Sequence, residues 1–347
     1  MSGKFIHTYE DIISLENLLE AWREFRIGKS CRSDVIEFEQ NLMSNLIILH
    51  HDLATNRYRH GAYQAFRIND PKPREIHKAS VRDRVLHRAI YRILYPYVDT
   101  RFIHDSYSCR DGKGTHKALD RFRSMEYVVS RNHTRTAWAL KCDICKFFAS
   151  ISHEVLIDIL KLSIPDSRIV DLLYRIIGSF HTTHRGVGLP LGNLTSQVFA
   201  NVYMNELDQF MKHTAHTRYY IRYADDFVVL SSDIEWLETL VPMIQEFLSS
   251  RLHLQLHPNK LFLKTFSSGV DFLGWVHFPD HRVLRTATKK RMFRHIKAGK
   301  NDPAQMQSYM GLLSHGNTAK IRRGLSDVRW QVFGSSFKNF MSESNVR

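Results

Sequence analysis

Two adjacent aspartates interrupt an apolar stretch in the second half of the chain. Asp225 and Asp226 lie in the middle of YIRYADDFVVL, residues 220–230. Because burying a carboxylate without a partner is costly, a positive species must compensate both side chains. The flanking segments YIRY and FVVL predict two short strands joined through Ala224, which places the aspartates at the tip of a hairpin. A solvated turn is the alternative interpretation of such a pair.

The composition indicates a globular chain with a polyanionic partner. The chain has 347 residues, of which 43% are hydrophobic, enough for one large core or two to three lobes. Lys and Arg outnumber Asp and Glu by 49 to 35, which favours nucleic acid over a membrane surface, with general solubility as the alternative. No apolar run of about 18 residues and no leader pattern is present, so we expect a cytoplasmic protein.

Cysteine chemistry is not expected to matter. The sequence has 4 cysteines, too few and too scattered for a disulfide framework in a chain of this length. Cys142 and Cys145 form a CxxC pair, but no second pair completes a zinc set. We therefore expect reduced thiols that pack as small hydrophobic side chains, with metal or redox use as the alternative.

The apolar periodicity predicts a mixed α+β fold. We expect two helices within residues 9–55, an extended segment and a helix within 71–98, and a helix near 235–251. Residues 137–151, AWALKCDICKFFASI, predict a buried strand that turns into a helix. GLPLGNLTSQ, residues 188–197, predicts a loop before a helix whose N-cap is Asn193 or Thr195. The alternating LHLQLH and the segment VDFLGWVHF complete this core.

Asp143 supplies a third carboxylate, at the end of the strand expected in LKCDICKFF. Mg²⁺ takes hard oxygen ligands and usually relies on one or two protein carboxylates, with substrate phosphates and water as the other ligands. Two such ions about 3.5–4 Å apart can activate a hydroxyl and stabilise a leaving pyrophosphate. The order of the motifs, with a Gly-containing loop and helix between Asp143 and the hairpin, favours this interpretation.

The ordered motifs resemble those of reverse transcriptases, the right-hand polymerases that copy RNA into DNA. The resemblance rests on DICKFFASI, GLPLGNLTSQ, YADD, LHPNK and VDFLG, in this order. PREIHKASVRDRVLHRAI and SYSCRDGKGTHKALDRF are similar to finger-region blocks of bacterial members of the group II intron lineage. It covers roughly residues 50–290. It implies an α+β right-hand polymerase with fingers, a palm with an antiparallel sheet, and a helical thumb, in a bacterium or phage.

The resemblance implies roles for residues at the metal centre. Asp143 and Asp225 would be the main metal ligands, and Asp226 would be a weaker one. The backbone carbonyl of Ile144 would add an oxygen, and the ion would be Mg²⁺ or alternatively Mn²⁺. Lys260, in LHPNK, matches a lysine that would protonate the departing pyrophosphate.

The resemblance also implies residues that bind nucleotide. Phe148 would lie under the sugar and select deoxynucleotides, with a core aromatic as the alternative. Lys72 and Arg74 would grip the triphosphate as a point charge and a bidentate fork. Arg110 would bind nucleotide and Arg84 would bind template, with ion pairs to helix carboxylates as the alternative for both.

Gln197 carries the finer prediction. The pattern LGxxxSQ, from Leu191 to Gln197, resembles reverse transcriptases of diversity-generating retroelements. That likeness implies copying with frequent errors at template adenines and an accessory protein partner. Because the Gln amide both donates and accepts, it could change contacts around the nascent base pair.

The C-terminal region predicts a basic helical thumb. Lys289, Lys290, Arg294 and Lys297 would follow duplex phosphates without reading bases, with a solvated basic face as the alternative. We expect an N-terminal helical extension at 1–60, fingers at 61–136, a palm at 137–280 with finger elements interleaved at about 160–195, and a thumb at 281–347. Maturase and endonuclease regions of intron proteins are not expected.

The predicted function is RNA-directed DNA polymerisation, with template RNA, nascent cDNA and deoxynucleoside triphosphates as partners. The biological alternatives are a diversity-generating retroelement and an antiphage defence enzyme that uses a dedicated noncoding RNA. A non-catalytic RNA-binding protein on a polymerase fold is the alternative from another class. No pattern in the sequence specifies the template, the priming reaction or the oligomeric state.

Overall fold

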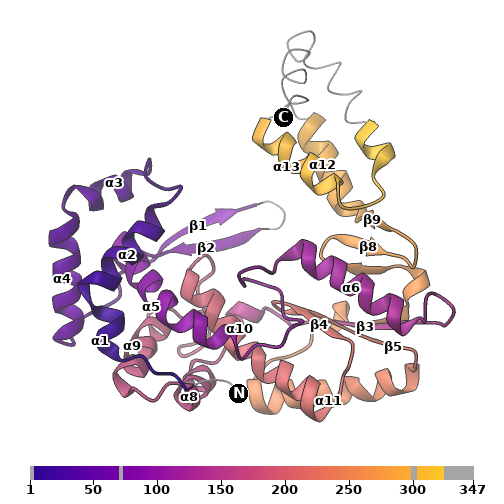
Figure 1. Cartoon of the computed structure of the whole chain (residues 1–347), viewed down its shortest axis with the longest axis horizontal. Helices are drawn as coiled ribbons and strands as arrows, with labels where there is room; N and C mark the ends of the chain where they lie inside the picture. Colours follow the sequence, from indigo (N-terminus) through magenta and orange to yellow (C-terminus); the bar gives the residue numbers. More distant parts are fainter. Residues whose placement is uncertain (1–3, 70–72, 298–302, 324–347) are drawn as a thin grey trace, which may run out of the picture. The chain divides into compact units, whose positions relative to one another are not determined.

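The computed structural model describes residues 4–69, 73–297 and 303–323 (Figure 1). The chain divides into two compact units, each of which is described by itself. The larger unit takes residues 1–114, 140–229 and 233–263, and the smaller unit takes 115–139, 230–232 and 264–347. Each unit is assembled from segments that are separate in the sequence. Of the predicted thumb at 281–347, residues 298–302 and 324–347 lie outside the described residues.

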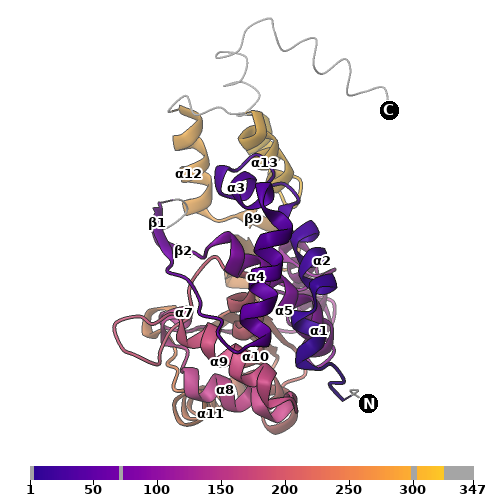
Figure 2. The same ribbon diagram turned by 90° about the vertical axis from the view of Figure 1, so that its left-hand side faces the viewer.

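The N-terminal region contains four helices where the sequence predicted two. They are α1 (Tyr9–Ile13), α2 (Leu15–Arg26), α3 (Ser33–Gln40) and α4 (Leu42–Ala54). The second predicted helix is interrupted at Asn41, whose φ of −122° and ψ of 37° end α3 and begin α4. The buried side chains of α2, which include Trp22 and Phe25, pack towards α5 (Val81–Asp99). Figure 2 shows α1, α2 and α4 beside one another.

Ion pairs attach α5 to the N-terminal helices. Ser80 caps α5, because its hydroxyl accepts a hydrogen bond from the backbone N–H of Asp83 at 3.1 Å. Arg82 pairs with Asp52 at 2.6 Å, and other arginines of α5 pair with carboxylates of α2 and α3. The preceding strands β1 (Gln64–Ile68) and β2 (Arg74–Lys78) form an antiparallel hairpin in which Ile68 lies opposite Arg74. This hairpin is largely exposed.

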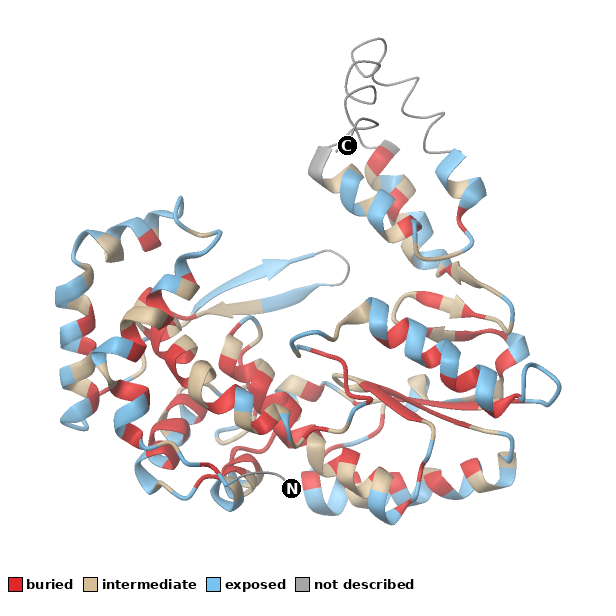
Figure 3. Cartoon of the chain, in the orientation of Figure 1, coloured by how far each residue is buried: buried red, intermediate tan, exposed pale blue. Residues whose placement is uncertain are grey.

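A four-stranded sheet forms the centre of the fold. Its order is β4 (Tyr220–Tyr223), β5 (Asp226–Ser231), β3 (Trp138–Asp143) and β6 (Phe262–Thr265), with β4 and β5 antiparallel. The middle residues of β3 and β5 are buried, as the red strands of Figure 3 show. The helices of the larger unit that follow β3 are α7 (Phe147–Ser150), α8 (His153–Ser163), α9 (Ser167–Gly178), α10 (Leu194–Gln209) and α11 (Ile234–Leu252). A π-helical turn, η1 (Phe210–Thr214), continues α10.

These elements confirm most of the predicted pattern. The strand that turns into a helix within residues 137–151 is β3 followed by α7, and the predicted hairpin is β4 with β5. LHLQLH is not a strand: only an isolated bridge between Ile144 and Leu256 forms there, and the 3₁₀ turn η2 (Pro258–Lys260) follows. The alternating leucines of this segment, Leu254 and Leu256, are buried beside the end of β3. The segment pairs with that strand at one bridge and does not extend into a ladder.

The smaller unit has its own sheet and core. α6 (Thr115–Val129) places Phe122 against Phe272 and His277, with ring centroids 4.9 and 5.0 Å apart. The strands β7 (Val270–Phe272), β8 (Trp275–His277) and β9 (Arg282–Leu284) are antiparallel neighbours in this order. The 3₁₀ turn η3 (Phe266–Ser268) precedes them, and α12 (Thr286–Lys297) and α13 (Pro303–Leu313) follow. In the described parts of the chain, no helix has the length and apolar character needed to cross a bilayer.

Candidate active site

The hairpin of β4 and β5 holds two of the predicted catalytic aspartates. Tyr223 lies opposite Asp226 in the ladder, so that only Ala224 and Asp225 form the turn. Ala224 has a φ of 55°, a left-handed conformation that is uncommon for a residue other than glycine. The turn is therefore tight, and Asp225 lies at its tip while Asp226 begins β5.

A buried ion pair braces this hairpin from within the larger unit. Arg222 and Asp208 are both fully buried, and the guanidinium donates to both carboxylate oxygens at 2.7 and 2.6 Å. Arg222 also donates to the carbonyl of Ala224 at 3.0 Å and to the hydroxyl of Ser106 at 3.1 Å. The hydroxyl of Tyr220 donates to Asp208 at 2.8 Å. Sequence reasoning missed Arg222 and Asp208, although an arginine within an apolar strand was an available signal.

Asp143 ends β3, and a neighbouring segment fixes its backbone. The N–H of His257 donates to the carbonyl of Asp143 at 2.7 Å, next to the bridge between Ile144 and Leu256. The segment that was expected to be a strand therefore anchors the end of β3. The role of the Ile144 carbonyl as a metal ligand stays a prediction.

The three aspartates share one electrostatic neighbourhood. Burial raises the pKa of Asp225, and the charge of Asp143 raises it further. Burial also raises the pKa of Asp226 to about 6. The charge of Lys141 lowers this pKa, and the charges of Asp143 and Asp225 raise it. The geometry agrees, because β3 and β5 are neighbours in the sheet and Lys141, two residues before Asp143, contacts Asp226.

Two lysines form ion pairs with Asp143 and Asp226. Lys260, at the end of η2, donates to Oδ1 of Asp143 at 2.6 Å. Lys141, two residues before Asp143 on β3, lies 3.1 Å from Oδ2 of Asp226. Sequence reasoning named Lys260 but missed Lys141, which the alternation of side chains along a strand places on the same face as Asp143.

The donor chemistry of the site fits a hard divalent cation. Oδ1 of Asp226 is buried and has no hydrogen-bond partner among the described residues, so one carboxylate oxygen is available inside the site. In the described ranges, no three side chains of His, Cys, Asp or Glu are arranged as a complete metal-binding group. Mg²⁺ does not require such a group, because it commonly combines one or two carboxylates with substrate phosphates and water.

The hairpin of β1 and β2 brings a cation towards the aspartates. Arg74 begins β2 and is exposed, and its charge lowers the pKa of Asp225. Arg74 makes no hydrogen bond or ion pair within the described part of the chain. Its partner in the prediction, Lys72, lies outside the described residues.

The loop before α10 is docked on β2. The N–H of His77 donates to the carbonyl of Leu191 at 3.0 Å, and Asn193 donates from its side chain to the carbonyl of His77 at 2.8 Å. Asn193 thus occupies the N-cap position without a capping side-chain bond, since its amide binds β2 instead. Gly192 has a φ of 100°, and a Cβ there would lie 2.7 Å from Ile76. Gln197 follows, half-buried, in the first turns of α10.

Phe147 and Phe148 have different surroundings. Phe147 is buried, at 3% exposure, and is therefore the core aromatic of the two. Phe148 is only half-buried, and its ring is 5.4 Å from that of Phe147 in an edge-to-face arrangement. Its carbonyl accepts a hydrogen bond from Leu189 at 2.8 Å, which ties it to the loop before α10. This position is compatible with the predicted contact to a sugar.

Two predicted binding arginines are occupied by carboxylates, as the alternative interpretation had it. Arg110 pairs with Asp99 at 2.6 Å and donates its remaining N–H groups to backbone carbonyls. Arg84 pairs with Asp34 at 2.5 Å and lies over the ring of Phe25. Both arginines thus connect elements of the larger unit, and their contact with nucleotide or template stays a prediction.

The basic residues of the predicted thumb lie on α12 of the smaller unit. Lys289, Lys290 and Arg294 are exposed, whereas the side chain of Lys297 lies outside the described residues. Their contact with nucleic acid stays a prediction.

Burial raises the pKa of Cys142 to about 12, so this thiol is protonated at neutral pH and packs as a hydrophobic side chain.

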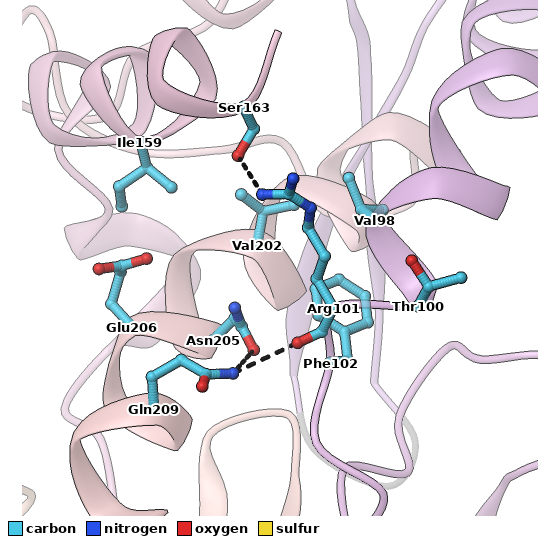
Figure 4. Close-up of a pocket in the computed structure, with 10 residues that line it drawn as sticks. All are labelled: Val98, Thr100, Arg101, Phe102, Ile159, Ser163, Val202, Asn205, Glu206 and Gln209. Atoms are coloured by element: carbon cyan, nitrogen blue, oxygen red, sulfur yellow. Dashed lines mark hydrogen bonds between the residues drawn. The ribbon is translucent and has the colours of Figure 1, made fainter. Parts of the chain in front are cut away.

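A separate cavity of about 400 Å³ lies elsewhere in the larger unit (Figure 4). Its ten lining residues come from the end of α5 and the segment that follows it, from α8 and from α10, and include Arg101, Ser163 and Glu206. Arg101 donates to Ser163 at 3.3 Å. None of the three aspartates lines this cavity, which is therefore not the site of the predicted chemistry.

Comparisons with known proteins agree with the motif pattern. A family model described as reverse transcriptase (RNA-dependent DNA polymerase) matches residues 69–277. YkfC of Escherichia coli K12 is 25% identical, over 72% of this chain and 74% of that protein. The group II intron-encoded protein LtrA of Lactococcus lactis is 22% identical, over 64% of this chain but 47% of that protein. This chain thus spans less than half of LtrA.

The solved structures that match this chain have low sequence identity to it. Apo telomerase from Candida tropicalis covers 65% of this chain and is covered to 54%, with a TM-score of 0.49 and 11% identity. A partial Cas6-RT-Cas1–Cas2 complex covers 70% of this chain and is covered to 42%, with a TM-score of 0.41 and 20% identity.

Proposed function

We propose, from the premise that this chain belongs to the reverse transcriptase (RNA-dependent DNA polymerase) family, that its three aspartates form the polymerising centre. The enzyme class that follows from the family is RNA-directed DNA polymerase, and the fold is that of a right-hand polymerase. The observation that carries the proposal is that β3, which ends at Asp143, lies beside β5, which begins at Asp226, so that carboxylates remote in sequence lie on neighbouring strands. The charge of Asp143 accordingly raises the pKa of Asp225.

Individual residues have distinct tasks in this proposal. Two bound Mg²⁺ ions would activate the primer hydroxyl and stabilise the leaving pyrophosphate. Asp143 and Asp225 hold these ions, and Asp226 offers its free oxygen Oδ1. Arg74 is exposed near the turn and binds the triphosphate, with Lys72 as its predicted companion. Lys260 has an ammonium group within the centre, where it can donate a proton to the departing pyrophosphate.

Primer extension tests this assignment. Purified protein with Mg²⁺, an RNA template, an annealed primer and deoxynucleotides should extend the primer, and Asp225→Asn should abolish extension because it removes a charged metal ligand. Asp158→Asn is the matched control, since Asp158 is 65% exposed and pairs only with Lys161 on the surface of α8. Extension by Asp225→Asn at the rate of this control would refute the metal assignment.

We further propose that the enzyme copies with low fidelity at template adenines, as in a diversity-generating retroelement with an accessory protein. The support is the LGNLTSQ loop, whose backbone is bonded to β2, the strand that carries Arg74. Gln197 follows this loop with a side-chain amide that can donate and accept. Sequencing of cDNA made on a template of mixed bases tests the idea. Error rates at adenine equal to those at the other bases would exclude it.

A further inference from the structure

Lys141 forms an ion pair inside the candidate active site. Its Nζ lies 3.1 Å from Oδ2 of Asp226, and the two side chains are only 11% and 20% exposed. Lys161 and Asp158 on α8 are separated by the same 3.1 Å, but their side chains are 59% and 65% exposed. The first pair is therefore held in a low-dielectric environment, where losing one partner is far more costly than on the surface.

The second lysine of the site differs from Lys141 in its freedom to move. Lys260 is 39% exposed and extends from a short 3₁₀ turn, whereas Lys141 lies within β3 beside β5. A cation that binds Asp143 can displace Lys260 towards solvent. The side chain of Lys141 is only 11% exposed, so its ammonium group has no comparable path to solvent. Its positive charge thus stays in the site when divalent ions bind.

The two oxygens of Asp226 are not equivalent. Oδ2 faces Lys141, while Oδ1 is buried and has no partner in the described part of the chain. A carboxylate held in this way can offer one oxygen to a cation and cannot chelate it with both. The nearby ammonium also repels an incoming divalent ion, which weakens its binding before a triphosphate supplies further negative charge.

We propose that Lys141 is a positioning residue that restricts Asp226 to a single free oxygen and lowers the affinity of the site for divalent cations in the absence of nucleotide. The inference rests on the proposed function and deepens it. It explains how carboxylates that repel one another stay in place without metal, and it makes full metal occupancy depend on the incoming nucleotide. Loss of Lys141 should therefore strengthen metal binding while weakening catalysis.

The test measures the affinity of the full chain for Mn²⁺, without nucleotide, by isothermal titration calorimetry. Lys141→Met should bind Mn²⁺ roughly tenfold more tightly than wild type, as expected for removal of one screened charge a few ångströms away. Its thermal midpoint in EDTA should fall by roughly 5–10 °C, because a buried carboxylate loses its partner. Primer extension should decrease. Lys141→Arg and the surface control Lys161→Met should bind Mn²⁺ as wild type does.

A double variant keeps the test valid if Lys141→Met does not fold. Lys141→Met with Asp226→Asn removes both members of the pair, and it should bind Mn²⁺ more tightly than Asp226→Asn alone. Mn²⁺ affinity that is unchanged or weaker in both comparisons would overturn the inference. Failure of the proposed function looks different: Asp143→Asn and Asp225→Asn would then leave wild-type Mn²⁺ binding intact.

Discussion

The two neighbouring phenylalanines after β3 differ in burial, and the predicted role in sugar selection belongs to Phe148. Phe148 is half-buried and bonded through its backbone to the loop before α10, whereas Phe147 is in the core. Phe148→Ala should admit ribonucleotides, because the ring that would clash with a 2′ hydroxyl is gone. We expect discrimination between deoxy- and ribonucleotides to fall by roughly 10- to 200-fold, the range for loss of one steric contact. Single-nucleotide incorporation kinetics measure it.

Phe147→Ala is the control for this prediction. It removes a buried ring and should cost about 3–5 kcal/mol of stability, without a specific change in sugar selection. Denaturant unfolding separates the two effects. If both variants lose the same fold of discrimination between deoxy- and ribonucleotides, Phe148 acts through packing alone.

The residues of the site that the sequence predicted are those whose chemistry is visible in a motif. Asp143, Asp225, Asp226 and Lys260 do meet around one centre. Lys141 was missed because a lysine within a strand gives no sign of its cross-strand partner. The ion pair of Arg110 with Asp99 at 2.6 Å could not be predicted either, because no sequence pattern shows which carboxylate lies beside an arginine.

At the scale of elements, the hairpin that carries Asp225 depends on a buried pair outside the reacting groups. Arg222 connects Asp208 of α10 to the carbonyl of Ala224 in the turn. Arg222→Met should destabilise the protein by about 3–5 kcal/mol, because Asp208 is left buried without its partner. It should also lower activity, since the left-handed turn loses a hydrogen bond. Denaturant unfolding and primer extension measure these effects.

A double variant separates the charge of this pair from its volume. Arg222→Met with Asp208→Leu replaces the ion pair by apolar side chains and should recover much of the lost stability. Activity should recover less, because the bond to Ala224 is still missing. Full recovery of activity together with stability would contradict a role of Arg222 in shaping the turn.

Element boundaries were predictable where one periodic pattern governs a segment. α2, α5, β3 and the hairpin follow from their apolar spacing. The break at Asn41 was not predicted, because the apolar residues on its two sides keep helical spacing across it. LHLQLH alternates like a strand, yet it forms just an isolated bridge with Ile144, flanked by backbone hydrogen bonds to Asp143 and Cys145. Alternation predicts which side chains are buried and cannot supply a ladder partner.

At the scale of the whole molecule, the compact units do not follow the order of the chain. The smaller unit takes residues 115–139 and 230–232 in addition to the C-terminal region from 264. The predicted fingers, palm and thumb follow the order of the chain, apart from the finger elements interleaved at about 160–195. A compact unit built from segments distant in the sequence cannot be predicted without knowing which of those segments contact one another. The division into fingers, palm and thumb stays a prediction.

The net charge of +14 leads to a prediction about nucleic-acid binding. If α12 contacts duplex phosphates, replacing Lys289, Lys290 and Arg294 by Gln should weaken binding of a primed RNA and reduce the slope of log affinity against log salt by up to about 3, near 0.9 per lost phosphate contact. Fluorescence anisotropy across a salt series measures this slope. A control removes the same charge by changing Arg23, Lys161 and Arg168, which are 63%, 59% and 55% exposed, to Gln. An equal slope change in both triple variants would assign the effect to net charge and exclude a binding face on α12.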